Sequence, residues 1–312
     1  MITNSILVIF GLLLLLYCAD RMIIFADTIA KEFSLSPILI GLTIVAFGTS
    51  APELVITIVA SLKDIPVTDA IIGNVIGSNV ANLILILGVS ALFFNIDLGQ
   101  IKNATNAFLF FITFYFAFIF FIDTSFGFIF SVGFFIFLIG FIYYLKNYQS
   151  EITDEDENNE EGFQRSIYIK LMLTFIGIFI GGKLFLDNSL DLFKYLGLQE
   201  TVIGVSVLAI GTSLPELATV ILAYIRKKGA IGIGNVIGSN IMNILFVFFP
   251  GLLIIQSRGL TFNIPENSIL HIYALMLSTI TIIILSLFKI KIGKVVALIF
   301  TGSYATYIWY IV

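Results

Sequence analysis

The sequence predicts an all-α membrane protein with many spanning helices, and two observations lead to this fold class. Of its 312 residues, 59% are hydrophobic and only 12% are charged, which is more apolar surface than a water-soluble chain of this length can bury. The apolar residues also occur in long runs. These runs are long enough to cross a bilayer as helices, and they are too long to be the strands of a membrane barrel.

Ten apolar runs are candidates for transmembrane helices, because a spanning helix needs about 20 residues. We expect the first run to be a retained helix, since neither a basic segment before it nor a small-residue cleavage site after it marks a signal peptide. The predicted helices cover residues 4–31, 35–62, 68–94, 103–122, 126–146, 167–195, 200–226, 230–256, 267–288 and 292–311.

One motif occurs twice in the chain. The first copy reads GLTIVAFGTSAPEL at 41–54 and GNVIGSNVANLI at 73–84, and the second reads GVSVLAIGTSLPEL at 204–217 and GNVIGSNIMNIL at 234–245. Each copy places a carboxylate, hydroxyls and amides within predicted membrane helices. Such groups are costly in lipid, and they usually face a cavity or one another. We therefore interpret the two copies as halves of one ion site.

A polar, acid-rich segment separates the two copies. It does not match an EF-hand calcium loop, because the sixth position counted from Asp154 is Asn159 in place of Gly and the twelfth is Arg165 in place of Glu. We predict a first five-helix repeat at 1–146, an acidic cytoplasmic linker at 147–166 and a second five-helix repeat at 167–312. Since five is odd, the second repeat is expected to have inverted topology, which is typical of secondary transporters.

The distribution of basic residues predicts the orientation in the membrane. With the N-terminus outside, twelve Lys and Arg residues lie at inner helix ends and loops and four at outer ones, as the positive-inside rule requires. The chain is thus expected to be a multi-pass cell-membrane protein with both termini outside. The Phe-rich fourth and fifth helices suit a lipid-facing scaffold. The acids and bases of the first and sixth helices are interpreted as interfacial or snorkelling charges.

Composition also excludes several classes of partner. The net charge is −4 without a basic domain, which argues against binding of nucleic acid. The single cysteine, Cys18, and the single histidine, His271, cannot form the thiolate or imidazole sets that zinc and copper prefer. We expect no cofactor and no obligate protein partner, so that the lipid bilayer and transported cations are the expected contacts.

Proline shapes both copies of the motif. Pro52 and Pro215 lack the backbone N–H that a helix needs, so each is expected to break its helix and free the carbonyl four residues earlier. Each copy also has two pairs in which a hydroxyl residue is followed, four positions later, by a Glu or an Asn. This spacing places the two side chains of a pair on the same face of a helix. These pairs are Thr49 with Glu53, Thr212 with Glu216, Ser78 with Asn82, and Ser239 with Asn243.

The resulting ligand set consists of oxygen atoms. Calcium takes about six to eight oxygen ligands in flexible geometry. Glu53 and Glu216 supply a charge of −2, which one Ca²⁺ neutralises and for which several Na⁺ can compete. An empty site would hold two unpaired anions within the membrane, which is unfavourable. The carrier should therefore return with ions bound more readily than empty, and we infer obligatory exchange. The GxxxG glycines at 73–77 and 234–238 are assigned to helix packing, which does not account for the two glutamates.

These motifs resemble the paired repeats of the cation/calcium exchanger superfamily, most closely those of prokaryotic sodium/calcium exchangers. The resemblance implies that Glu53 and Glu216 are central ligands shared by Ca²⁺ and Na⁺. It also implies that the first and sixth helices form a mobile pair that gives alternating access. The implied neutral ligands are Thr49, Thr212, Ser50, Ser213, Ser78, Ser239, Asn82 and the backbone carbonyls of Ala46 and Ala209, and Asn243 completes the candidate metal site.

One position departs from the family pattern. Second repeats of this superfamily commonly have Asp where this chain has Asn243, so the site has two acids and a potassium-dependent exchanger is disfavoured. A sodium/calcium antiporter is the leading hypothesis, and a proton/calcium antiporter that uses the same glutamates is the alternative. A calcium channel usually needs a ring of subunits. An enzyme is disfavoured because acid and base catalysis needs two unlike carboxyl groups, whereas these two are equivalent.

Overall fold

The structure is a computed structural model that describes the chain except for residues 1, 123–124, 151–165, 196–210, 265–267 and 312. The first half is helical almost throughout, with three of its spans in the expected places and two built from shorter pieces. Its helices are α1 (Ile2–Glu32), α2 (Pro37–Ile40), η1 (Gly41–Val45), α3 (Ala46–Thr49), α4 (Ala51–Leu62), α5 (Thr68–Val80), η2 (Ala81–Ile86), α6 (Leu87–Phe93), η3 (Leu98–Gln100), α7 (Asn103–Ile122) and α8 (Phe128–Ser150).

The described part of the second half is also mainly helical. Its described helices are α9 (Ser166–Tyr195), α11 (Leu214–Ile225), α12 (Gly229–Met242), η4 (Asn243–Phe248), α13 (Phe249–Ser257), α14 (Ser268–Leu287) and α15 (Lys294–Ile311). In the described part of the chain, seven helices are long and apolar enough to cross a membrane, or eight if the bent pair 37–49 and 51–62 is one span. The all-α membrane class is thus confirmed, and the count of ten stays a prediction.

Two short ribbons connect the halves of the chain. Strand β1 (Ile96–Asp97), which follows α6, pairs antiparallel with β4 (Lys291–Ile292), which precedes α15. Strand β2 (Ser125–Phe126), which precedes α8, pairs antiparallel with β3 (Phe262–Asn263), which follows α13. In both ribbons, the strand after the third predicted span of one half meets the strand before the fifth predicted span of the other half.

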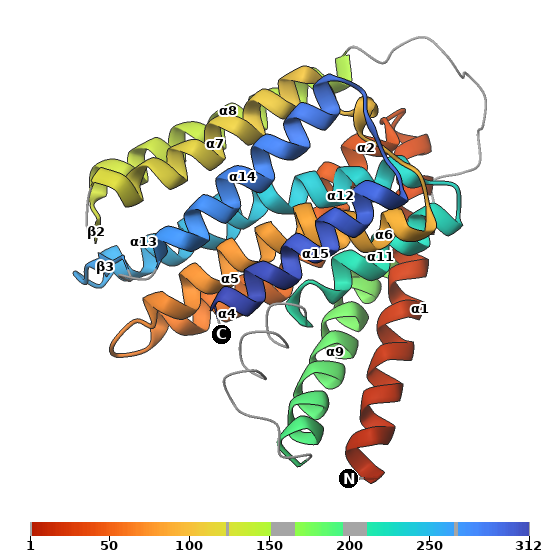
Figure 1. The fold of residues 1–312 in the computed structure, drawn as a ribbon, viewed down its shortest axis with the longest axis horizontal. Coiled ribbons are helices and arrows are strands. Elements are labelled where there is room, and N and C mark those ends of the chain that lie inside the picture. Colours follow the sequence, from red (N-terminus) through yellow and green to blue (C-terminus); the bar gives the residue numbers. More distant parts are fainter. Residues whose placement is uncertain (1, 123–124, 151–165, 196–210, 265–267, 312) are drawn as a thin grey trace.

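Helices α1 and α9 lie side by side and run at a steep angle to α5, α12 and α14 (Figure 1). Their facing side chains, which include Leu15, Met22 and Ile178, belong to an apolar cluster that is distinct from the main core. Gly11 permits the close approach, because a Cβ there would lie 2.8 Å from the carbonyl oxygen of Gly181. The two helices therefore pack as a pair against the rest of the bundle.

The charges on α1 have specific partners, which the sequence interpretation did not anticipate. Asp20 forms a two-pronged ion pair with Arg226, which directly follows α11. Asp27 pairs with Lys228 at 2.8 Å and with Lys31 at 3.3 Å. The pairs with Arg226 and Lys228 join α1 to the connection between α11 and α12, so these charges also hold parts of the bundle together.

The Phe-rich helices α7 and α8 are only partly a lipid-facing scaffold. They expose Phe111, Phe118 and Phe135, as expected. However, Phe116 and Phe134 are fully buried and pack against Phe248 of η4, with ring centroids 4.8 and 5.6 Å apart. These two helices therefore also support the segment that begins at Asn243.

Candidate ion-binding site

The first copy of the motif breaks its helix where Pro52 predicts, and the second copy has the same backbone turn just before Pro215. Helix α3 ends at Thr49 and α4 begins at Ala51, with Ser50 between them at φ −82° and ψ 7°, and the two parts meet at an angle of 46°. Ser213 precedes α11 with nearly the same backbone, φ −89° and ψ 5°. Because a proline has no N–H to donate, the carbonyl of the glycine four residues before each proline is left without its helical partner.

The break places both glutamates in the first turn of a helix. Glu53 lies in the first turn of α4 and Glu216 in the first turn of α11, and both side chains are 0% exposed. The N-terminal end of a helix carries partial positive charge, which favours a carboxylate there. Glu216 lies within electrostatic range of Glu53 and close to the hydroxyls of Thr49 and Ser50. The two copies thus bring their acids together in the protein interior.

Hydroxyl groups of one copy meet those of the other. Ser78 donates a hydrogen bond to Oε1 of Glu53 at 3.3 Å, and its Oγ lies 3.5 Å from Oγ1 of Thr212. On the other side, Oγ of Ser239 lies 3.4 Å from Oγ1 of Thr49. In each case, the serine from the second block of one copy contacts the threonine from the first block of the other copy.

Several buried oxygens at this place have no hydrogen-bond partner among the described residues. A buried polar atom without a partner costs free energy, and most such atoms in proteins are paired. On the residues that the sequence singled out, the unpaired oxygens are Oγ of Ser50 and Ser213, Oε2 of Glu53, both carboxylate oxygens of Glu216, and Oδ1 of Asn82 and Asn243. Oδ1 of Asn240, another asparagine of the motif, is unpaired as well, and oxygens of this kind suit a hard cation.

The remaining predicted ligands lie beside this set or outside the described residues. The carbonyl of Ala46 accepts hydrogen bonds from the Ser50 N–H at 3.0 Å and from the Thr49 hydroxyl at 3.3 Å. Ala209 lies outside the described residues. Among the residues that are described, no three or more His, Cys, Asp and Glu side chains are grouped so that they could hold a metal ion. A cation here would therefore be held mainly by neutral oxygens around two carboxylates.

Two segments of π-helix mark the asparagines of the candidate site. Helix η2 begins at Ala81, next to Asn82, and η4 begins at Asn243. Such π-helical turns are rare and occur often at functional sites. Helix η2 packs against α11, which bears Glu216, and η4 packs against α4, which bears Glu53. Each asparagine thus lies on an element that contacts the glutamate-bearing helix of the other copy.

The sequence interpretation missed four further asparagines of the motif. Asn235 accepts a hydrogen bond from Thr49 at 3.0 Å, whereas its counterpart Asn74 donates to the backbone carbonyl of Glu53 at 2.9 Å. Asn79 and Asn240 are buried between α5 and α12. The signal that could have found them is their identity in both copies, where GNVIGSN is repeated without change.

Close packing of glycines holds the first block of one copy against the second block of the other. A Cβ at Gly234 would lie 2.3 Å from the carbonyl oxygen of Ile38, and one at Gly238 would lie 2.5 Å from that of Leu42. The expected packing role is thus confirmed for 234–238. At Gly73 and Gly77, a Cβ would meet no described atom within 4 Å, and the segment 196–210 lies outside the described residues.

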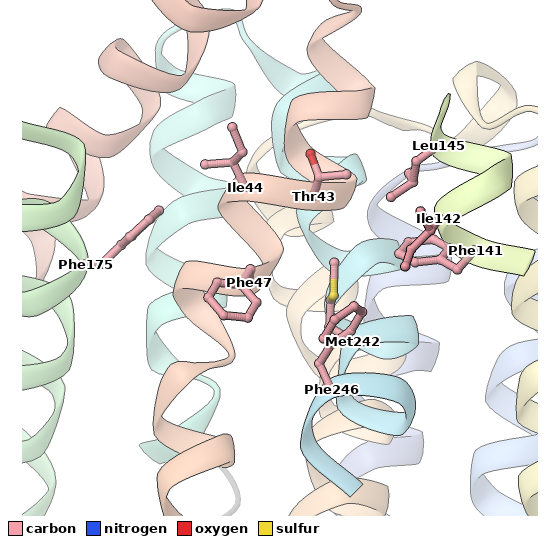
Figure 2. Close-up of a pocket in the computed structure, with 9 residues that line it drawn as sticks. All are labelled: Thr43, Ile44, Phe47, Phe141, Ile142, Leu145, Phe175, Met242 and Phe246. Carbon is pink, nitrogen blue, oxygen red and sulfur yellow. The ribbon is translucent and has the colours of Figure 1, made fainter. Parts of the chain in front are cut away.

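An apolar pocket of about 290 Å³ is lined by side chains of the broken helix, α8, α9, α12 and η4, and it shares no residue with the candidate site (Figure 2). Its one polar lining side chain is Thr43, whose hydroxyl donates to the carbonyl of Leu39. The ring of Phe175 on α9 fills the space where a Cβ of Gly48 would lie. A pocket without a free polar group does not suit ions, so it is not the cation site. Its lining residues are Thr43, Ile44, Phe47, Phe141, Ile142, Leu145, Phe175, Met242 and Phe246.

The fold and this site define a multi-pass membrane protein with a set of buried, unpaired oxygens in its interior. A family model described as sodium/calcium exchanger protein matches residues 4–146 and 166–312. The chain belongs to the sodium/calcium exchanger family.

Relatives and a solved structure agree with this assignment. The sodium/calcium exchanger MaX1 of Methanosarcina acetivorans is 33% identical over 310 residues, which cover 84% of this chain and 87% of the relative. The inner membrane protein YrbG of Escherichia coli is 30% identical over 268 residues, which cover 81% of each chain. A solved structure of the sodium-calcium exchanger NCX_Mj, soaked with 10 mM Na⁺ and no Ca²⁺, is similar with a TM-score of 0.78. It is 29% identical, with coverage of 98% of this chain and 97% of that one.

Proposed function

We propose that this protein exchanges Na⁺ for Ca²⁺ across the membrane, at one site that is built from both copies of the motif. The observation that carries the proposal is the set of buried, unpaired oxygens on Ser50, Glu53, Ser213 and Glu216. These atoms lie where the two broken helices meet. Membership of the sodium/calcium exchanger family and the likeness to MaX1 and NCX_Mj support the same ions.

In this proposal the two glutamates are the ligands that Ca²⁺ and Na⁺ share. Two ionised carboxylates balance one Ca²⁺, and Na⁺ ions compete for the same oxygens. The neutral ligands are the hydroxyls of the Thr-Ser pairs, the serines at 78 and 239, the asparagines at 82 and 243 and the carbonyls at 46 and 209. An empty site leaves carboxylates unbalanced in the membrane interior, which is unfavourable. Exchange of one cation for another is therefore easier than return of the empty carrier.

The proposed transmembrane arrangement has ten spans in two inverted five-helix repeats, 1–146 and 167–312, with the acidic segment 147–166 between them. The ribbon pairing supports this division, because β1 pairs with β4 and β3 with β2 in the manner that a twofold relation between the halves requires. The two stretches matched by the family model also fall on either side of the acidic segment. Both termini are placed outside and the acidic segment in the cytoplasm, in accordance with the positive-inside rule.

The proposed access mechanism uses the pair formed by α1 and α9. These helices have their own apolar cluster and contact the rest of the bundle mainly through α11 and the broken helix. A pair that is packed within itself in this way suits movement as one body. Its displacement across the broken helices would open the site to one side of the membrane and then to the other.

The experiment that tests the proposal is calcium uptake by proteoliposomes. Vesicles that contain the purified protein are loaded with Na⁺ or with choline, and radiolabelled calcium is added outside. We expect rapid uptake only with internal Na⁺, and none with the Glu53→Gln variant. A separate arm imposes a proton gradient without Na⁺. Uptake that follows the proton gradient and ignores Na⁺ would overturn the sodium coupling and favour a proton/calcium antiporter.

A further inference from the structure

Asn79 and Asn240 occupy the same position in the two copies of the motif, yet they make different hydrogen bonds. The Nδ2 group of Asn79 donates to the backbone carbonyl of Asn240 at 3.3 Å, and its Oδ1 accepts from Nδ2 of Asn243 at 2.9 Å. The side chain of Asn240 turns back to its own helix, where Nδ2 donates to the carbonyl of Val236 at 2.8 Å. Both side chains are buried, with exposures of 0% and 1%.

The direction of this chain of hydrogen bonds is fixed by a backbone atom. A backbone carbonyl only accepts hydrogen bonds, so the group that Asn79 turns toward Asn240 must be its NH₂. The side-chain oxygen of Asn79 then faces Asn243. Because that oxygen can only accept, Asn243 must present its own NH₂ to it. The remaining atom of the Asn243 amide, Oδ1, is buried without a hydrogen-bond partner among the described residues.

The corresponding asparagine of the first copy is held differently. Neither Oδ1 nor Nδ2 of Asn82 has a hydrogen-bond partner among the described residues. Oδ1 of Asn240, the counterpart of the Asn79 oxygen that holds Asn243, likewise has no hydrogen-bond partner among the described residues, while the NH₂ of Asn240 donates to Val236. The two halves of the site are therefore not equivalent, although the sequence is Asn at both positions. Asn243 is oriented, whereas Asn82 is free to turn either end of its amide toward the centre.

From these contacts we infer that Asn79 is a positioning residue, which orients Asn243 so that its side-chain oxygen faces the transported cation. The inference rests on the proposed function, in which Asn243 is a neutral ligand. Torsion about the terminal bond of an asparagine is broad and roughly twofold, so an unheld amide is free to turn its NH₂ to the site. An oxygen attracts Ca²⁺ or Na⁺, and an NH₂ group repels it. Asn79 thus contributes to calcium affinity without touching the ion.

The chain supplies a matched control for this role. Asn79→Ala removes the acceptor that holds Asn243. Asn240→Ala removes the same number of atoms at the equivalent buried position and keeps the backbone carbonyl that Asn79 needs. We expect Asn79→Ala to raise the calcium concentration for half-maximal uptake by about fivefold, the effect of one hydrogen bond, with a smaller change in maximal rate. Asn240→Ala is expected to change this concentration by less than about twofold.

A double variant tests whether Asn79 acts through Asn243. In an Asn243→Ala background, there is no amide to orient. The further change Asn79→Ala is therefore expected to change the calcium concentration for half-maximal uptake by less than about twofold. Independent effects would multiply instead. If Asn79→Ala does not yield folded protein, Asn79→Leu and Asn240→Leu keep the side-chain volume close to that of Asn and allow the same comparison. Binding is also measured in detergent, as the calcium-induced shift in melting temperature.

The outcomes separate this inference from the proposed function. Wild-type protein that shows no sodium-driven calcium uptake overturns the function itself. Wild-type protein that is active, with equal effects of the Asn79 and Asn240 substitutions, overturns only the positioning role. The positioning role is also overturned if Asn79→Ala raises the calcium concentration for half-maximal uptake by the same factor in the wild type and in the Asn243→Ala background. A loss of calcium affinity that is confined to Asn79 and absent from the Asn243→Ala background supports it.

Discussion

Ser78 and Thr212 are 134 positions apart in the sequence, yet their hydroxyl oxygens lie 3.5 Å apart. The same Ser78 hydroxyl donates to the carboxylate of Glu53 at 3.3 Å. One hydroxyl thus touches the acid of its own copy and the threonine of the other. This contact joins the two halves of the candidate site. A cation bound here would be coordinated by these oxygens, and the weak contacts between the hydroxyl groups would be lost.

Removal of this hydroxyl should weaken calcium binding. Ser78→Ala takes away one proposed ligand oxygen and one hydrogen bond. A hydrogen bond is worth about 1 kcal/mol, which corresponds to roughly a fivefold change. We expect the calcium concentration for half-maximal uptake to rise by that factor in proteoliposomes. Ser278→Ala is the control, because Ser278 is also buried but donates to Leu275 of its own helix. Equal effects of the two substitutions would contradict the role of Ser78.

The glutamates should be required for calcium binding but not for folding. Glu53→Gln and Glu216→Gln keep the size of the side chain and remove its charge, so each is expected to abolish uptake. Calcium should raise the melting temperature of the wild-type protein, because it binds the folded state, and should not raise that of either variant. Glu32→Gln, at the exposed end of α1, serves as the control. Near-normal uptake by either buried variant would show that the site is wrongly assigned.

Replacement of Asn243 by Asp should change the ion preference. The new carboxylate adds a third negative charge, which allows more Na⁺ to be held. It also faces Oδ1 of Asn79, which cannot donate to it. We expect Na⁺ to inhibit calcium uptake at a lower concentration than in the wild type. Asn188→Asp on α9, whose amide bonds within its own helix, should have no effect. The same sodium dependence in both variants would show that the amide at 243 is not important for selectivity.

Contact between the two copies depends on small residues. A Cβ at Gly234 would lie 2.3 Å from the Ile38 carbonyl oxygen, so Gly234→Ala forces the first block of one copy away from the second block of the other. Overpacking of this kind costs about 1–3 kcal/mol, and we expect a lower melting temperature together with reduced uptake. Gly302→Ala on α15 is the control, since a Cβ there meets no described atom within 4 Å. An unchanged melting temperature for Gly234→Ala would contradict the packing argument.

The class of fold and the helix breaks could be predicted from the sequence because they depend on local chemistry. Apolar runs of about 20 residues predict membrane helices whatever their neighbours are. A proline removes a hydrogen bond wherever it lies within a helix, so the breaks before Pro52 and Pro215 were predictable. The proximity of Glu53 and Glu216 could also be predicted, because the chain has two matching blocks, GTSAPEL and GTSLPEL, that each place a carboxylate within a membrane helix. Such costly groups usually face a cavity or one another.

The asymmetry of the site was not predictable in the same way. Asn79 and Asn240 stand in identical GNVIGSN sequences, but one reaches across to the other copy and the other bonds to its own helix. The difference arises from the packing of α5 against α12, which depends on the whole fold. The ion pairs between α1 and the connection after α11 were missed for the same reason, since Asp20 and Arg226 are 206 positions apart.

The central claim is that both copies build one site, which Ca²⁺ and Na⁺ share. Equilibrium calcium binding to the purified protein, measured by titration calorimetry at increasing Na⁺ concentration, tests it most directly. We expect one Ca²⁺ per chain, an apparent affinity that falls steadily as Na⁺ rises, and no binding by Glu53→Gln or by Glu216→Gln. Two Ca²⁺ per chain with one lost in each variant, or a calcium affinity that Na⁺ does not change, would contradict it.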